Sequence, residues 1–266
     1  MKKFYLLLPF LAVMSCSTVA EDTSDFDNPI LVTKMVQDGD NYTFSYSGAK
    51  ITEMRNTTDN WKRVFTYSGD LITKFVDTLP DNSTQTTTIT YNSNNKITKK
   101  TTVYSAVPSQ TDTTTYTYIG GDKIKIITTI AATGSTKTYT KDAVTNPDNS
   151  LKNWEENVSW VQGSTTTTGN GTLQTITYDG GSFPFKNVTG YTKLLLVTED
   201  LNVSNRNVLR YKNIITYPGT GNEYTNFQSS YEYHTNGYPK KDVRDYYDEN
   251  DMATSSEITT YEYNHL

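Results

Sequence analysis

Short runs of alternating apolar and polar residues cover most of the chain from about residue 40 onward, and they come in pairs. In the first pair, Phe44 and Tyr46 are two residues apart, Ser47 and Gly48 follow, and Ile51 begins the apolar positions of the second run. Residues two apart share one face of a strand, and Gly tolerates the positive φ of tight hairpin turns. The pattern therefore predicts β-hairpins with one apolar and one polar face.

The same hairpin unit recurs, with 21–27 residues between its turn-flanking tyrosines. In four units an isoleucine follows the tyrosine at a nearly constant distance: Tyr46 and Ile51, Tyr67 and Ile72, Tyr91 and Ile97, Tyr118 and Ile124. We expect an all-β fold, an antiparallel meander of successive hairpins that forms a strongly twisted sheet or an open or half barrel. Helix and strand patterns do not alternate, which disfavours a parallel α/β fold.

Two stretches depart from the hairpin pattern. Residues 142–171 are rich in turn-forming residues and predict a long excursion between hairpins. Residues 190–201 predict either a short helix or a buried strand over 193–198, because periodicity does not separate the two for short runs. In the helical alternative the inward residues are Tyr191, Leu194, Leu195 and Leu201. We expect one β-rich domain over residues 30–266, with a split near residue 145 as the alternative.

The N-terminal segment has the layout of a secretory signal. Lys2 and Lys3 precede an apolar run of 11 residues, which is shorter than the roughly 20 residues of a membrane-spanning helix. The run ends in Val13-Met14-Ser15-Cys16, and Cys16 is the only cysteine. This resembles a bacterial lipoprotein lipobox, which implies a signal peptide over 1–15, cleavage before Cys16 and a covalent lipid on Cys16 that attaches the protein to a membrane. No other cofactor is expected.

Residues 16–29 are polar and acidic, so they predict a flexible tether. The acidic residues, which begin at Glu21, also resemble the surface-export signal of Bacteroidetes lipoproteins, although they start later than in the usual pattern. This resemblance implies an exported outer-membrane lipoprotein displayed at the cell surface. A periplasm-facing orientation is the alternative.

The hairpin units resemble the YD or RHS-type repeat, whose core is Y-x-Y-D-x-x-G-R-L. The segments TITYDGG and YEYHTNGYP come closest, but the Arg is missing throughout and the Asp is present only at Asp179. The similarity is closer to the small YD-like flavobacterial (Bacteroidetes) lipoproteins, which tend to carry a PFKN segment and a late GYP turn. Residues 184–187 and 237–239 match these two segments. The resemblance implies a β-rich envelope lipoprotein and no known activity.

The amino-acid composition limits the kinds of ligand and reaction that the chain could support. The 47 Thr and 21 Tyr form about a quarter of the chain, and both residue types favour strands. The net charge of −5 and the lack of a basic run argue against a nucleic-acid partner. A single cysteine and two histidines argue against disulfides, zinc sites and nucleophile–base catalysis. We therefore expect a protein that is not an enzyme.

One segment carries a candidate ligand contact. Trp154, Glu155, Glu156 and Trp160 lie in NWEENVSW, where indole faces could stack on sugar rings and carboxylates could bind hydroxyls. The alternative is that the tryptophans cover the sheet core and the glutamates are solvated. Neighbouring residues of a strand point to opposite faces, so Glu155 and Glu156 do not suit the paired carboxylates of a glycosidase.

Two further sets of residues are weaker candidates. Asp245, Asp248 and Asp251 form an acidic turn that could offer oxygens to calcium, or could simply be a charged hairpin tip that discourages edge pairing. The triplets Asp77-Thr78-Leu79 and Asp112-Thr113-Thr114 resemble the O-glycosylation motif of Bacteroidetes. That resemblance implies Thr78 and Thr113 as acceptors.

These observations favour a lipid-anchored, non-enzymatic envelope protein that acts as a surface-exposed binding or structural module for a glycan or an envelope or extracellular protein. The first alternative is a periplasm-facing half-barrel that carries a hydrophobic ligand, or an envelope accessory protein. The second alternative, a glycan-processing enzyme, requires two carboxylates that face each other across a groove.

Overall fold

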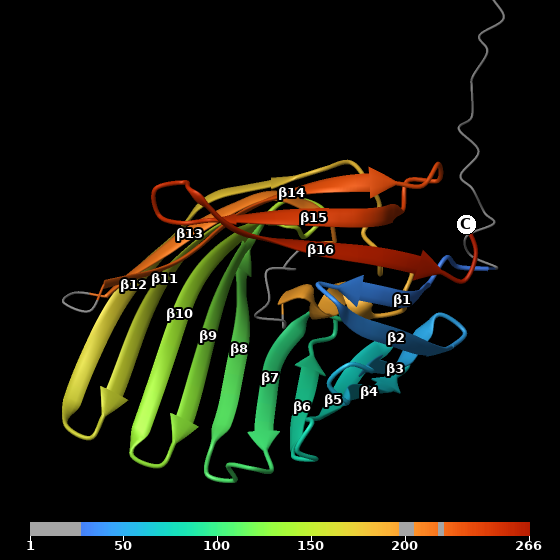
Figure 1. The fold of residues 1–266 in the computed structure, drawn as a ribbon. Coiled ribbons are helices and arrows are strands. Elements are labelled where there is room, and N and C mark those ends of the chain that lie inside the picture. The colour runs from blue at the N-terminus through green and yellow to red at the C-terminus, as the bar shows by residue number, and fades with distance from the viewer. Residues whose placement is uncertain (1–27, 197–204, 218–220) are drawn as a thin grey trace, which may run out of the picture.

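The computed structural model describes residues 28–196, 205–217 and 221–266, and the strands in these ranges form one antiparallel β-barrel (Figure 1). The strands are β1 (Val32–Gln37), β2 (Asp40–Ser47), β3 (Lys50–Asn56), β4 (Trp61–Ser68), β5 (Leu71–Thr78), β6 (Thr84–Tyr91), β7 (Ile97–Tyr104), β8 (Thr111–Gly120), β9 (Lys123–Ala132), β10 (Ser135–Thr145), β11 (Leu151–Gln162), β12 (Thr165–Tyr178), β13 (Val208–Tyr217), β14 (Gly221–Tyr233), β15 (Pro239–Tyr247) and β16 (Ala253–Tyr263). A short 3-10 helix, η1 (Tyr191–Leu196), lies in the connection between β12 and β13.

The sheet closes on itself. Each strand pairs antiparallel with its neighbours in sequence, and β1 also pairs with β16, with Val32 opposite Tyr263 and Gln37 opposite Thr259. The all-β meander is thus confirmed, but the open or half barrel expected from the sequence is wrong. Closure hydrogen-bonds the two terminal strands to each other, whereas an open sheet would leave each with an unpaired edge.

The recurring tyrosine hairpins share a β-bulge. In the hairpins β2–β3, β4–β5 and β6–β7, one extra residue interrupts the pairing next to the tyrosine. At the bulge, two residues of the second strand lie opposite one residue of the first. The side-chain alternation of the second strand therefore shifts by one position, and both the tyrosine and the following isoleucine face the interior. Ile51 and Ile72 are fully buried as a result. The extra residue is a threonine in each hairpin, and its hydroxyl donates to a backbone carbonyl of the partner strand: Thr52 to Ser45, Thr73 to Thr66 and Thr98 to Thr90.

The tyrosine hydroxyls of these hairpins donate to backbone carbonyls of other segments. Tyr46 donates to the carbonyl of Val32 at 2.7 Å, and Tyr91 donates to the carbonyl of Ile72 at 2.7 Å. A buried hydroxyl needs such a partner, because an unmade hydrogen bond costs more than a formed one gains. These hydrogen bonds link Tyr46 and Tyr91 to preceding strands, whereas the Tyr67 hydroxyl donates to the carbonyl of Thr189 in the β12–β13 connection at 3.2 Å.

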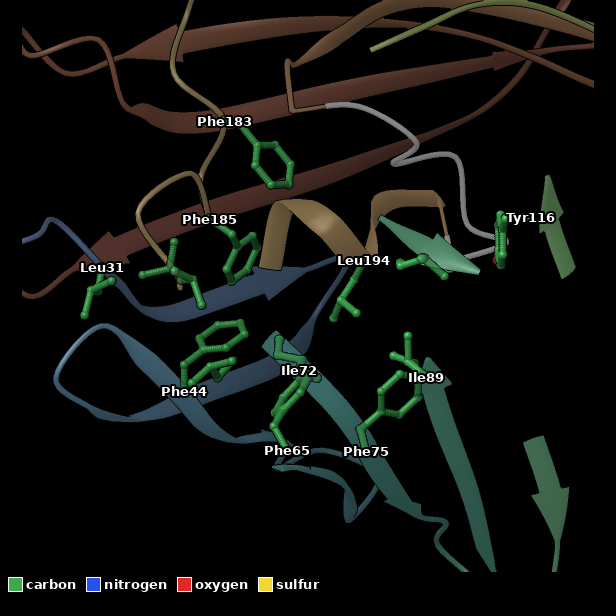
Figure 2. Close-up of a cluster of buried hydrophobic side chains, with 14 of the residues drawn as sticks. Leu31, Phe44, Phe65, Ile72, Phe75, Ile89, Tyr116, Phe183, Phe185 and Leu194 are labelled. Carbon is green, nitrogen blue, oxygen red and sulfur yellow. The ribbon is translucent and has the colours of Figure 1, made fainter. Parts of the chain in front are cut away.

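The barrel interior is packed around two apolar clusters. The first contains residues of strands β1–β9, and the second contains residues of β10–β14, including Trp154 and Phe227. The β12–β13 connection folds into one end of the barrel, and we call its residues 179–196 the plug. Phe183, Phe185 and Leu194 of the plug point at the first cluster (Figure 2). The rings of Phe185 and Phe44 meet edge to face, 5.3 Å apart.

A row of hydroxyl side chains crosses the outer face of the barrel. Its members are register partners on seven consecutive strands, β6 to β12: Thr88, Thr101, Thr113, Thr129, Thr138, Ser159 and Thr168. Charged side chains share this face, and Lys125 and Asp142 form an ion pair of 3.4 Å there. The outer face of β6 to β12 is therefore polar along this row, while exposed apolar side chains such as Val103, Val161 and Ile258 lie elsewhere on the outer wall.

One local expectation is wrong. The excursion expected over 142–171 does not form, because these residues complete β10, build β11 and begin β12. The stretch from Tyr191 forms the short 3-10 helix η1 and not the alternative buried strand, with Leu194 buried and Tyr191 packed against the first cluster. Leu201 lies outside the described residues, so the expectation about its inward position stays a prediction.

Candidate functional site

Hydrogen bonds fasten the plug to several turns at one end of the barrel. The backbone amide of Ser182 donates to Gly237, and that of Thr189 donates to Ala49. The Asn187 amide nitrogen donates to the Tyr238 hydroxyl at 2.6 Å and to the carbonyl of Ile30 at 3.3 Å. The PFKN segment and the GYP turn, which are far apart in sequence, therefore contact each other directly. The plug is a fixed part of the barrel end.

Gly190 lets the plug approach the β4–β5 turn. Its φ is +73°, and a Cβ built on it would lie 2.5 Å from the backbone oxygen of Asp70. Any other residue would meet both a strained backbone conformation and a steric clash. The absence of a side chain at Gly190 thus permits a close contact between the backbones of the plug and the β4–β5 turn.

A cavity of about 580 Å³ lies inside the barrel beside the plug. Plug residues, among them Phe183, Phe185 and Leu194, line one side, and inward residues of β14–β16 line another. Gln37 and Trp61, at the end of β1 and the start of β4, line it too, far from the plug-bearing turns. The cavity therefore extends from the plug toward the opposite rim. Its volume falls in the range of small-molecule sites.

The wall formed by β14–β16 brings polar side chains to this cavity. Asp242 and Arg244 occupy alternate positions of β15, so both face inward. Glu257 of β16 lies opposite Arg244 and accepts a 2.7 Å hydrogen bond from Gln37. Asp242 is only 5% exposed, and its Oδ1 atom has no hydrogen-bond partner. A buried carboxylate oxygen without a donor is costly, so this atom is a candidate ligand contact.

Burial dominates the electrostatics of Asp242. Desolvation raises the pKa of its carboxyl to about 6, nearby Arg244 lowers it and Glu257 raises it further. Desolvation also raises the pKa of the Tyr231 hydroxyl, on the neighbouring strand β14. Arg244 stacks over the ring of Phe227 at 4.5 Å, which holds its guanidinium in place. Asp242 and Arg244 were not among the candidate residues predicted from the sequence. Their only signal was a two-residue spacing in a predicted strand.

A second guanidinium lines the cavity from the opposite set of strands. Arg63 of β4 donates to both carboxylate oxygens of Asp77 on β5, at 2.7 and 3.0 Å. Its guanidinium also lies 4.2 Å from the centre of the Phe75 ring. The bidentate pair fixes the orientation of Arg63 at the cavity wall.

The structure separates the candidate ligand residues around Trp154. Trp154 is 2% exposed and belongs to the second apolar cluster, and Glu156 is also buried and forms an ion pair of 3.6 Å with Lys141. Glu155 points outward, opposite Thr172. Trp160 is 42% exposed and donates its indole NH to Ser135. These four residues therefore do not form one continuous patch.

The acidic turn is engaged by neighbouring protein groups. Asp251 bonds Lys212 at 2.9 and 3.0 Å, and Asp248 accepts backbone amides of its own turn. Asp245 accepts the Ser256 hydroxyl. Within the described ranges, no group of three or more His, Cys, Asp and Glu side chains is arranged to hold a metal ion.

The two threonine candidates differ in position, and Cys16 lies outside the described residues. Thr78 ends β5, beside the inward-pointing Asp77. Thr113 lies within β8, in the outer hydroxyl row. Glycosylation of either residue and lipidation of Cys16 stay predictions.

Comparisons with known proteins support the fold. No protein-family profile and no curated protein matches the chain. A porin-like protein from Bacteroides vulgatus is similar in structure, with 14% identity and a TM-score of 0.51 over 89% of this chain and all of that one. A porin-like protein from Bacteroides uniformis has 11% identity and a TM-score of 0.40 over 88% and 96% of the two chains. The similarity to the Bacteroides vulgatus protein supports the closed β-barrel fold. In its described part, no helix has the length and hydrophobicity that crossing a bilayer requires.

Proposed function

We propose that this protein is a non-enzymatic binding protein of the outer membrane, anchored by a lipid on Cys16, whose barrel stands outside the bilayer. The observation that supports this best is the hydroxyl row from Thr88 to Thr168. A membrane-spanning barrel needs an outward apolar band about 25 Å tall. The row of Thr and Ser, with charged residues beside it, suits contact with water.

The interior also favours binding over conduction. The plug occupies one end of the barrel, and Phe185 and Leu194 fill the space against the first apolar cluster. The remaining cavity has polar groups on one wall and aromatic groups on another. This mixed lining differs from the wholly apolar cavity that an acyl-chain carrier requires. The two carboxylates of the polar wall, Asp242 and Glu257, lie on adjacent strands and do not face each other across a groove.

The position of the tether gives the barrel an orientation. Ile30 lies at the plug end, where its carbonyl accepts from Asn187. A lipid on Cys16 would hold this end toward the membrane and leave the opposite rim facing away from it. The cavity would then be reached from the aqueous side. We propose that this side is the cell exterior.

Membrane extraction tests the anchor against the second candidate function, a membrane-spanning pore, which the porin-like fold favours. The test variant carries Cys16→Ser and an ordinary signal-peptidase site in place of the lipobox. We expect the wild type in the membrane fraction and the variant in the soluble fraction, with equal thermal stability. A variant that stays in carbonate-washed membranes would overturn the proposal and support a spanning barrel.

Protease treatment of intact and permeabilised cells tests the orientation. We expect degradation in intact cells, with a periplasmic protein as the control for an unbroken outer membrane. Protection until permeabilisation would place the barrel in the periplasm.

A further inference from the structure

The cavity beside the plug has a chemical character that narrows its ligand. One wall carries planar polar groups, and Asp242, Arg244 and Glu257 place a carboxylate acceptor, a guanidinium donor and a second carboxylate close together. The other walls carry aromatic side chains, among them Trp61 and Phe185, whose ring is stacked on Tyr191. Donors and acceptors on one side and aromatic faces on another suit a ligand with one polar edge and one flat apolar face.

The unpartnered oxygen of Asp242 marks the candidate contact point on this wall. Asp242 is only 5% exposed and lines the cavity, and its Oδ1 atom accepts no hydrogen bond. Its neighbours already have partners, because Glu257 accepts from Gln37 and Arg244 bonds the Ser229 hydroxyl at 3.4 Å. Most native buried polar atoms are satisfied, so an exception at a cavity wall calls for a donor from a bound molecule.

The charged groups beside Asp242 bear on the charge of the ligand. Three carboxylates (Asp59, Asp242, Glu257) and three guanidiniums (Arg63, Arg206, Arg244) line the cavity. Asp77 pairs with Arg63 and Asp148 pairs with Arg206, so the three carboxylates of the cavity face mainly Arg244, and this excess of acceptors favours a ligand that donates hydrogen bonds. A free cation near Asp242 would meet Arg244, and a free anion near Arg244 would meet Asp242. Neutral hydroxyl groups, which both donate and accept, avoid this conflict.

We infer that the cavity binds a neutral saccharide, with adjacent ring hydroxyls on Asp242 and Arg244 and the apolar face of the ring toward the aromatic residues. The inference rests on the proposed binding role but not on the lipid anchor, since the cavity is the same with or without the lipid. It also moves the expected glycan contact from Trp154, which is packed in the second apolar cluster, to the cavity wall that carries Asp242.

Calorimetry on the full-length protein tests the inference. The probes are neutral hexoses and pentoses and their disaccharides, with dodecanoic acid and leucine as an apolar and a zwitterionic comparison. We expect at least one saccharide to bind the wild type. Its affinity for Asp242→Asn should be at least tenfold lower, and its affinity for the exposed control Glu155→Gln should equal that of the wild type. No saccharide binding, binding only of dodecanoic acid or leucine, or binding unchanged by Asp242→Asn would overturn the inference.

Thermal stability separates a ligand contact from a structural role. Asp242→Asn removes an unpaired buried charge, so we expect the free variant to melt at the same or a higher temperature while its saccharide affinity falls. Lower stability together with lower affinity would indicate that Asp242 supports the fold, and would overturn its assignment as a ligand contact. If the Cys16→Ser variant stays in the membrane but the protein still binds a saccharide, the lipid anchor is refuted and the binding inference stands.

Discussion

The Asn187 amide donates a 2.6 Å hydrogen bond to the Tyr238 hydroxyl, and this contact joins the plug to the β14–β15 turn. Tyr238 is 1% exposed, and the Lys186 ammonium lies 4.7 Å from the centre of its ring. We expect Asn187→Ala and Tyr238→Phe each to lower the free energy of unfolding by about 1 kcal/mol. Because the two groups contact each other, the double variant should lose less than the sum of the single losses. Urea unfolding of all four proteins measures this; strict additivity would contradict a shared bond.

Gly190 should tolerate no side chain. In Gly190→Ala the new Cβ would meet the Asp70 carbonyl, and its backbone would be strained, so we expect a loss of about 2 kcal/mol or more. The matched control is Gly180→Ala, since a Cβ there has no heavy atom within 4 Å. Thermal melting compares the two variants. Equal melting temperatures would show that the plug shifts to accept the methyl group.

The buried ion pair between Arg63 and Asp77 should matter more than a surface pair. Asp77 is 5% exposed at its side chain, so Asp77→Ala leaves a partly buried guanidinium uncompensated, and we expect a loss of about 3 kcal/mol. Glu262→Ala breaks the exposed pair with Lys34 and should cost at most about 1 kcal/mol. Denaturant unfolding of both variants provides the comparison. A similar small loss in both would mean that solvent reaches Asp77.

The raised pKa of Asp242 predicts a pH dependence of stability. The folded pKa is about 6 and the ordinary value is 3.8, so between these values the folded state holds the proton more tightly than the unfolded state. This contribution is fully present below the ordinary pKa and is lost as the pH rises through about 6. The charged and titratable groups around the carboxyl are Arg244, Glu257, Tyr231 and Tyr261.

Melting temperatures across pH 4 to 7 check this. The fall in stability with rising pH should be smaller in Asp242→Asn than in the wild type, and unchanged in the control Glu155→Gln. Parallel curves for all three proteins would place the titrating group elsewhere.

The hairpin unit could be predicted because its determinants are local. Tyr46, the Ser47-Gly48 turn and Ile51 lie within six residues, and alternation fixes which of them face inward. Barrel closure could not be predicted in this way. The pairing of β1 with β16 joins the two ends of the chain, and no local pattern in either strand names its partner.

The cavity residues Asp242 and Arg244 could not be predicted from the sequence, for a related reason. Asp242 and Arg244 stand among lysines, aspartates and tyrosines in a strand that reads as solvated. Only the pairing of β15 with β14 and β16 shows that they face inward. For Glu155 and Glu156, the alternation put the two side chains on opposite faces, and the alternative interpretation placed the tryptophans over the core and both glutamates in solvent. Trp154 is buried as that alternative expects, but Glu156 is buried too, because its face is the packed interior.

The pairing of β1 with β16 also sets the order in which the molecule can fold. The Thr33 hydroxyl bonds the carbonyl of Glu262, 229 positions later in the chain. Hairpins such as β2–β3 can form from neighbouring residues, whereas the final seam must wait until the last strand has been synthesised. Until then β1 and the growing sheet present open edges, which attract other chains. The chain is therefore exposed to edge-to-edge association until β16 pairs with β1.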